Sequence, residues 1–177
     1  MSSSEAPTRR FMLAIALGAA ALSGGCLRPL YAEGTTSTIG GSVKSALRDV
    51  EIGEMKGLSG HYLRNELVFE LDGGGEPSGP KRLVLEAAIT ESLEVLTVDY
   101  TNGRADSAVL VAKAVWSVKR IGSGEVVASG TNTVRSPYER SQQRFSTVRA
   151  ARDAQIRAAK SLATLIRGQL AADLTAG

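Results

Sequence analysis

Residues 81–118, KRLVLEAAITESLEVLTVDYTNGRADSAVLVAKAVWSV, decide the fold of this 177-residue chain. Apolar residues recur at every second position over 81–98 and again over 108–118, which is the period of a β-strand with one buried face. Asn102-Gly103 lies between these runs and is a hairpin signature, because both residues tolerate a positive φ. The stretch therefore predicts two long antiparallel strands joined by a tight turn.

The residues after this stretch predict a third strand and a long helix. Gly122-Ser123-Gly124 turns the chain, and 125–135 is rich in Val and Thr, as is typical of a strand. From about Phe145 to Leu174, apolar residues are spaced by three or four and form a narrow stripe: Ile156, Ala159, Ala163, Ile166 and Leu170. Because the stripe contains small residues, we expect this helix to pack closely on a sheet.

The residues before the stretch predict one short strand and one more helix. Residues 48–54 alternate around Val50 and Ile52. After Ser59, apolar residues recur at helical spacing up to Leu71, and the glycine-rich segment 72–77 ends the pattern. The predicted order is strand, helix, three-strand meander and helix. This is an α+β fold with two helices packed on one face of a four-stranded, mostly antiparallel sheet.

The first 25 residues have the layout of a bacterial signal peptide of the lipoprotein type. Arg9-Arg10, an uncharged run over 11–22 and three small residues precede Cys26, the only cysteine of the chain. A cysteine directly after such a cleavage site predicts an acylated thiol that anchors the chain in a membrane. Residues 27–47 are rich in Gly, Ser and Thr and predict a flexible tether. We therefore divide the chain into a signal peptide (1–25), a lipidated N-terminus with its tether (26–47) and a folded domain (48–177).

Other interpretations of this N-terminus stay open. The apolar run of 12 residues is shorter than the roughly 20 residues of a membrane-spanning helix. Cys26 is an unmodified thiol if the cleavage site is an ordinary one. The segment 8–13 also resembles a twin-arginine export signal, so the choice between the Sec and twin-arginine routes is open. Leu27 stands where an Asp favours retention in the inner membrane, which predicts the periplasmic face of the outer membrane.

The sequence offers no constellation for catalysis or metal binding. His61 is the only histidine, and neither a second histidine nor a further thiolate is present to complete a zinc site. Gly73-Gly74-Gly75 is followed by Glu-Pro rather than Lys-Ser, so it is not a phosphate-binding loop. Glu86, Glu91 and Glu94 are better explained as solubilising charges than as the paired acids of a hydrolase. With a net charge of only +3, we expect a binding protein rather than an enzyme, with no cofactor and no nucleic-acid partner.

Arginines mark the candidate ligand site. Arg104 lies just past the hairpin turn, while Arg135, Arg140 and Arg144 lie around the loop that leads into the last helix. Guanidinium groups bind phosphates and carboxylates in a two-pronged geometry. For a lipoprotein that faces the outer membrane, a phosphorylated glycolipid is a candidate ligand. The alternative is that each arginine is only solvated at the surface.

The order of several motifs resembles the LPS-assembly lipoprotein family, LptE. Residues 25–31 (GCLRPLY) are similar to the start of the mature chain in that family, and residues 63–67 (LRNEL) to its first-helix motif. The hairpin at 102–103, the strand end at 134–138 and the Ala- and Arg-rich last helix with Asp153-Ala154 follow in the same order. The resemblance covers essentially the whole chain after the signal peptide.

This resemblance implies a fold, a function and partners. The implied fold is two helices against a four-stranded sheet. The implied function is that of an outer-membrane lipoprotein that plugs the LptD barrel, assists its assembly and helps to insert lipopolysaccharide (LPS) into the outer leaflet. Basic residues near the hairpin tip and near the start of the last helix contact LPS in the family. This implies Arg104 at the first place, although Thr101 directly before the turn is not basic, and Arg144 or Arg149 at the second.

A different class of function stays open beside this one. The chain is then a periplasmic lipoprotein that scaffolds another envelope complex or binds a small apolar ligand between helix and sheet. We expect a ligand binder to hold a sizeable internal cavity, and a barrel plug to have a filled core and a polar outer surface.

Overall fold

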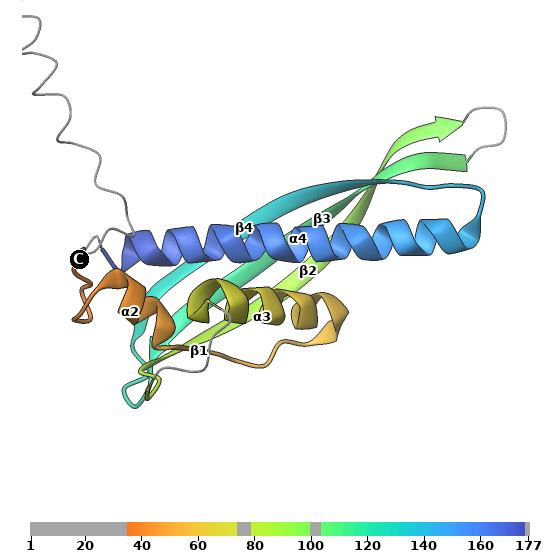
Figure 1. The fold of residues 1–177 in the computed structure, drawn as a ribbon. Helices are drawn as coiled ribbons and strands as arrows, with labels where there is room; N and C mark the ends of the chain where they lie inside the picture. The colour runs from red at the N-terminus through yellow and green to blue at the C-terminus, as the bar shows by residue number, and fades with distance from the viewer. Residues whose placement is uncertain (1–34, 74–78, 100–103, 176–177) are drawn as a thin grey trace, which may run out of the picture. The chain divides into compact units, whose positions relative to one another are not determined.

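A four-stranded sheet in the order β1-β2-β3-β4 organises the domain (Figure 1). In the computed structural model, residues 35–73, 79–99 and 104–175 are described. The strands are β1 (Val50–Ile52), β2 (Leu83–Asp99), β3 (Arg104–Arg120) and β4 (Val126–Glu139). β1 is parallel to β2, whereas β3 is antiparallel to both β2 and β4. The predicted four-stranded, mostly antiparallel sheet is confirmed, and the turn residues 102–103 lie outside the described residues.

Two long helices cover one face of this sheet. They are α3 (Gly57–Asp72) and α4 (Arg144–Asp173), and Figure 1 shows both on the same side of the strands. α4 packs along β4 and beside α3. Both helices lie where the apolar spacing predicted them, so the α+β fold class is confirmed.

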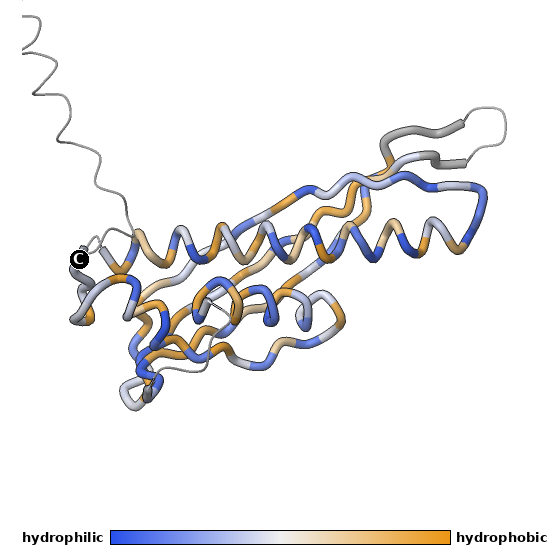
Figure 2. The backbone as a smooth tube through the Cα atoms, viewed as in Figure 1, coloured by the Kyte–Doolittle hydropathy of each residue, from blue (hydrophilic) through white to orange (hydrophobic). Residues whose placement is uncertain are grey.

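The core lies between these helices and the sheet. Even-numbered residues of β3 face the helices, and Ala108, Ala112, Ala114, Trp116 and Val118 are all buried there. Fully buried leucines and an isoleucine meet them from the two helices: Leu63, Leu67, Leu162, Ile166 and Leu170. Figure 2 shows the corresponding alternation of hydrophobic and hydrophilic residues along the helices and strands. Since α4 offers alanines at its buried stripe, its axis approaches the sheet closely.

The end of the predicted tether is part of the folded domain, which corrects the prediction for residues 35–47. The N–H of Thr38 donates to the carbonyl of Leu174 at 2.9 Å. Residues 43–47 form most of a third helix, α2 (Val43–Arg48), which buries Val43, Ala46 and Leu47. The side chain of Ser42 caps it by accepting a hydrogen bond from the backbone N–H of Ser45 at 3.1 Å. The prediction missed this helix because its three apolar residues lie within a segment rich in Gly and Ser. Residues 26–34 of the tether and the signal peptide lie outside the described residues.

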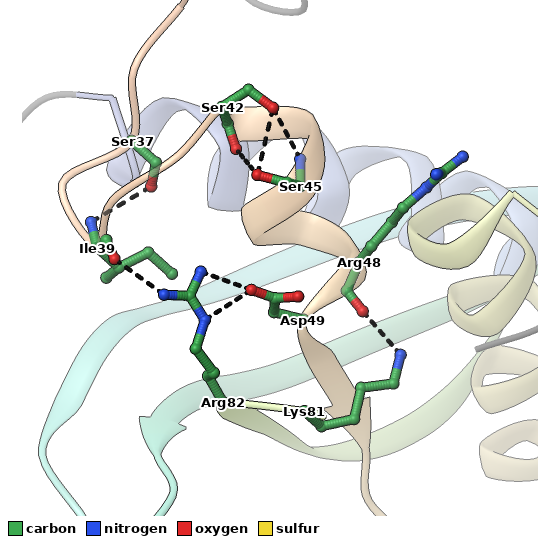
Figure 3. A network of polar contacts seen from close by, with 8 residues as sticks. All are labelled: Ser37, Ile39, Ser42, Ser45, Arg48, Asp49, Lys81 and Arg82. Carbon is green, nitrogen blue, oxygen red and sulfur yellow. Dashed lines mark hydrogen bonds and ion pairs between the residues drawn. The ribbon is translucent and has the colours of Figure 1, made fainter. Parts of the chain in front are cut away.

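Polar contacts fasten the segment around α2 to the start of β2 (Figure 3). Arg82 donates from Nε to the Asp49 carboxylate at 2.6 Å and from Nη1 to the carbonyl of Ile39 at 3.2 Å. Lys81 donates from Nζ to the carbonyl of Arg48 at 2.7 Å and to the carboxylate of Asp72 at 2.8 Å. The described N-terminal segment is therefore bound to the sheet and to the end of α3.

Candidate functional site

The sheet face opposite the helices is covered by no described helix, and we call it the open face. Its exposed polar members come from the three long strands: Thr90, Ser92, Lys113, Thr131 and Thr133. Ala88 and Val115, which is 52% exposed, are apolar residues exposed on the same face. Two pairs of opposite charges on this face form across strands. Lys119 contacts Glu86 at 2.5 Å, and Arg135 forms a two-pronged ion pair with Glu94. The open face thus offers the hydroxyl groups of Thr131 and Thr133 and two neutralised charge pairs.

The start of α4 and the connection before it carry a cluster of arginines, which we call the basic surface: Arg140, Arg144, Arg149 and Arg152. Among the described residues, no acidic side chain forms an ion pair with any of the four. The first turn of α4 contains no acidic residue either, and its N-terminal end adds the positive pole of the helix dipole. Figure 2 shows a strongly hydrophilic connection from β4 into this helix. The basic surface therefore favours a negatively charged ligand.

Apolar side chains lie among these arginines. Phe145 is 74% exposed and Val148 is 60% exposed, although both belong to the same helix as the buried core stripe. The guanidinium carbon of Arg149 lies 5.8 Å from the centre of the Phe145 ring, a cation–π contact. The surface is thus both cationic and apolar, which is the combination that an anionic amphiphile needs.

A pocket of about 490 Å³, the inner pocket, lies beside the basic surface. Four elements line it: Leu58 of α3, Leu110 of β3, Tyr138 of β4, and Val148, Ala151, Arg152 and Gln155 of α4. Val148 and Arg152 also line a second hollow along α4, together with Phe145 and Arg149. The inner pocket is therefore apolar at its floor and borders the arginines through α4.

A network of hydroxyl groups positions the start of α4. The Ser141 N–H donates to Thr147 Oγ1 at 3.1 Å, and Thr147 Oγ1 donates to the Ser141 carbonyl at 3.0 Å. The N–H of Gln143 donates to Ser141 Oγ at 2.9 Å. Further along α4, Arg157 donates to the carbonyl of Pro137 at 2.9 Å and pairs with Asp153. The first three bonds hold the connection before α4 against its first turn, and the Arg157–Pro137 bond links α4 to β4.

Glu91 holds the other side of the inner pocket together. The Ser59 hydroxyl at the start of α3 donates to the Glu91 carboxylate, which also accepts a hydrogen bond from Gln155 Nε2 of α4 at 3.0 Å. The prediction of a merely solubilising charge is incomplete at this residue, because Glu91 links β2 to both helices. This link places Leu58 and Gln155 at the wall of the pocket.

The structure brings only part of the predicted site together. Arg144 and Arg149 lie on α4 within the basic surface, both exposed. Arg104 begins β3, but its side chain is outside the described residues, as is the whole of Cys26. Sequence reasoning did not single out Arg152, Val148 or Leu58. The spacing of Phe145, Arg149 and Arg152, at positions four and seven along a helix, was the signal for a shared helix surface.

The described residues hold no group of three or more His, Cys, Asp or Glu side chains arranged to bind a metal ion. His61 is exposed, and its Nε2 lies 3.1 Å from the side-chain amide of Asn65 on the same helix. Within the described ranges, no helix has the length and apolarity of a membrane span.

No protein-family model and no curated protein matches the sequence. Solved structures do share the fold. A protein assigned as a lipoprotein of Caulobacter crescentus CB15 is 25% identical, with a TM-score of 0.62 over 76% of this chain and 97% of that one. A minor lipoprotein of Acinetobacter baumannii is 17% identical, with a TM-score of 0.54 over 70% of this chain and 90% of that one. Rare lipoprotein B of Shewanella oneidensis has 16% identity and a TM-score of 0.43, over 67% and 92%, a likeness too weak to argue from. The chain therefore shares its fold with bacterial lipoproteins.

Proposed function

We propose that this chain is a lipid-anchored lipoprotein of the cell envelope and works at the outer membrane as an LptE-type subunit. In this role it plugs an LptD-type β-barrel, assists assembly of that barrel and helps to insert LPS into the outer leaflet. The fold shared with the Caulobacter and Acinetobacter lipoproteins supports the envelope assignment. Cys26 behind the predicted signal peptide supports a lipid anchor.

The main support for a barrel partner comes from the open face. The interior of an outer-membrane barrel is lined mostly by polar side chains. A plug therefore needs an outer surface that supplies hydrogen-bonding groups without burying unpaired charge. The hydroxyls of Thr131 and Thr133 supply the first property, and the Glu86–Lys119 and Glu94–Arg135 pairs supply the second.

The basic surface supports contact with LPS, a lipid that carries phosphate groups. Arg144 and Arg149 present guanidinium groups to solvent with no acidic partner among the described residues. Charge-assisted hydrogen bonds from guanidinium to phosphate are among the stronger polar contacts of proteins. Arg104 at the start of β3 is the third candidate of the site. The proposed role is binding rather than catalysis and needs no cofactor.

Purification of the tagged, lipidated protein from membranes in mild detergent tests this function. We expect a large β-barrel to co-purify at equal stoichiometry and to survive washing. The Cys26→Ala variant lacks the thiol, so we expect it to incorporate no labelled fatty acid, which tests the lipid anchor separately from the barrel. Recovery of the wild-type protein alone, or with inner-membrane partners, would contradict the proposal.

The inner pocket favours one alternative function, that of a periplasmic lipoprotein that binds a small apolar ligand. Its volume of about 490 Å³ lies within the roughly 300–1,000 Å³ that is common for ligand sites. However, Leu58 and Val148 of its wall are exposed, so the pocket opens at the surface. Scaffolding of another envelope complex would instead appear in the same purification as a different partner.

A further inference from the structure

The apolar floor of the inner pocket continues onto a part of the sheet that no described helix covers. Odd-numbered residues of β2 face the helices, and Leu85 is fully buried there. Leu93 and Val95 face the same side, yet each is 49% exposed. The reason is that α3 begins at Gly57 and reaches β2 only as far as the Ser59–Glu91 contact.

This uncovered part of β2 joins the pocket directly. Leu93 is paired in register with Leu110, which lines the inner pocket. Leu58 at the start of α3 is 46% exposed beside them. Exposed apolar residues that adjoin a pocket in this way are typical of a binding surface.

The rim of the same pocket is cationic on its α4 side, where neither Arg149 nor Arg152 has an ion pair among the described residues. The carboxylate of Glu91, at the other side of the pocket, accepts hydrogen bonds from Ser59 and Gln155. Arg152 lines the pocket, and Arg149 lies one turn earlier on α4. Asp153, the nearest acidic residue along the helix, is paired with Arg157 at 2.8 Å. An occupant must therefore combine an apolar body with a negatively charged end.

We propose that the inner pocket and the uncovered end of β2 hold an acyl chain of a phosphorylated lipid, whose phosphate Arg149 and Arg152 bind. The backbone of β3 in the floor is hydrogen-bonded to β2 on one side and β4 on the other. An extended peptide lying across that floor would find no backbone partner on β3. An acyl chain needs none. The inference rests on the proposed function for the identity of the lipid, and it adds where the chain is held.

Site-specific photo-crosslinking in cells tests the inference on the full, processed protein. A photoreactive phenylalanine analogue replaces Val148 in cells grown with radioactive phosphate, and tryptic peptides are analysed by mass spectrometry. We expect a phosphate-labelled adduct whose added mass includes acyl chains on the peptide of residues 145–149. The same analogue at Leu165, 46% exposed on α4 away from the pocket, is the matched control and should give at least tenfold less adduct.

Charge reversal distinguishes binding that depends on the lipid phosphate from non-specific contact between lipid and exposed apolar side chains. The double variant Arg149→Glu, Arg152→Glu should lower the Val148 adduct at least tenfold, while Lys160→Glu on the same helix should leave it unchanged. A circular dichroism spectrum identical to wild type shows that the double variant is folded. If it is not, the milder Arg152→Gln should still lower the adduct severalfold.

Three outcomes would overturn the inference: equal adducts at Val148 and Leu165, an adduct without phosphate, or an adduct that charge reversal leaves intact. An adduct to the acyl groups on the chain's own Cys26 would contain no phosphate and would therefore also overturn the inference. Co-purification of the β-barrel is followed in the same cells. A barrel without a lipid adduct refutes only the acyl site, whereas an adduct without a barrel refutes only the translocon role.

Discussion

Leu67 lies at the centre of the domain, where α3 packs on the sheet, and its side chain is fully buried. Truncation to Ala removes apolar contacts and leaves a cavity that the surrounding helices cannot fill. We expect Leu67→Ala to lower the free energy of unfolding by about 2–5 kcal/mol, measured by urea denaturation. Phe69, two residues away and 62% exposed, is the matched control. Phe69→Ala should change stability by less than about 0.5 kcal/mol, and equal effects of the two would contradict the packing.

Substitution of glycine by alanine is expected to have opposite effects on stability at two positions. A Cβ at Gly130 of β4 would lie 2.8 Å from the ring of Trp116, whose Nε1 is held by Asn132 at 2.7 Å. We expect Gly130→Ala to destabilise the domain by about 1–3 kcal/mol through overpacking. A Cβ at Gly168 within α4 would meet nothing within 4 Å. Gly168→Ala should therefore raise stability by about 0.5–1 kcal/mol, because alanine loses less backbone entropy in a helix. Thermal unfolding of both variants measures the contrast.

At the scale of elements, substitutions in α2 test whether this segment is folded or is a loose tether. Leu47 is 3% exposed, and its helix is fastened through Asp49 and Arg82 (Figure 3). We expect Leu47→Ala to lower the free energy of unfolding by about 2–5 kcal/mol, as for other buried leucines. Lys44→Ala on the exposed side of the same helix should have little effect. A loosely packed tether would predict no loss for either variant, so urea denaturation decides between the two.

The long elements were predictable because their periodicity extends over many residues. Alternation along β2 and β3 and the narrow stripe of α4 assigned the element type and most of the buried face. In the stripe, the prediction is wrong for Ile156, which is 40% exposed, and it omits Leu162, which is fully buried. α2 was not predictable in the same way, since its six residues hold only three apolar positions inside a Gly- and Ser-rich segment. The exposure of Leu93 and Val95 could not be predicted from the sequence either. They alternate in step with the buried residues of β2, which predicts burial. They are exposed because α3 meets β2 no further along than Glu91.

The candidate site was predictable in its charges but not in its geometry. Arg144 and Arg149 follow from the start of the last helix, which the pattern predicted well. The inner pocket instead joins Leu58 to Val148, residues far apart in sequence that the Glu91 contacts bring to one wall. Contacts of this kind depend on register and helix placement, which no local pattern encodes.

At the scale of the whole molecule, the open face must contact either solvent or a partner protein, because no described helix covers it. A sheet with one covered and one uncovered face is stable in water if the uncovered face is largely polar. Thr131 and Thr133 contribute hydroxyl groups to it, beside the 52% exposed Val115. The same hydroxyls are the groups that a polar barrel wall would contact in the proposed complex. Solvation alone and barrel contact therefore make different predictions for a bulky substitution on this face.

Thr133→Trp tests which of the two holds. Tryptophan is well accommodated in an exposed strand, so the fold and its stability should change little. Its ring would project from the open face and prevent close approach of a barrel wall, so we expect co-purification of the barrel to fall at least tenfold. Ser161→Trp, on the exposed side of α4, is the control for the added ring and should retain the barrel. If Thr133→Trp retains the barrel as well, the open face is a solvated surface and the barrel contact must lie on the helix side, where the basic surface and the inner pocket already stand.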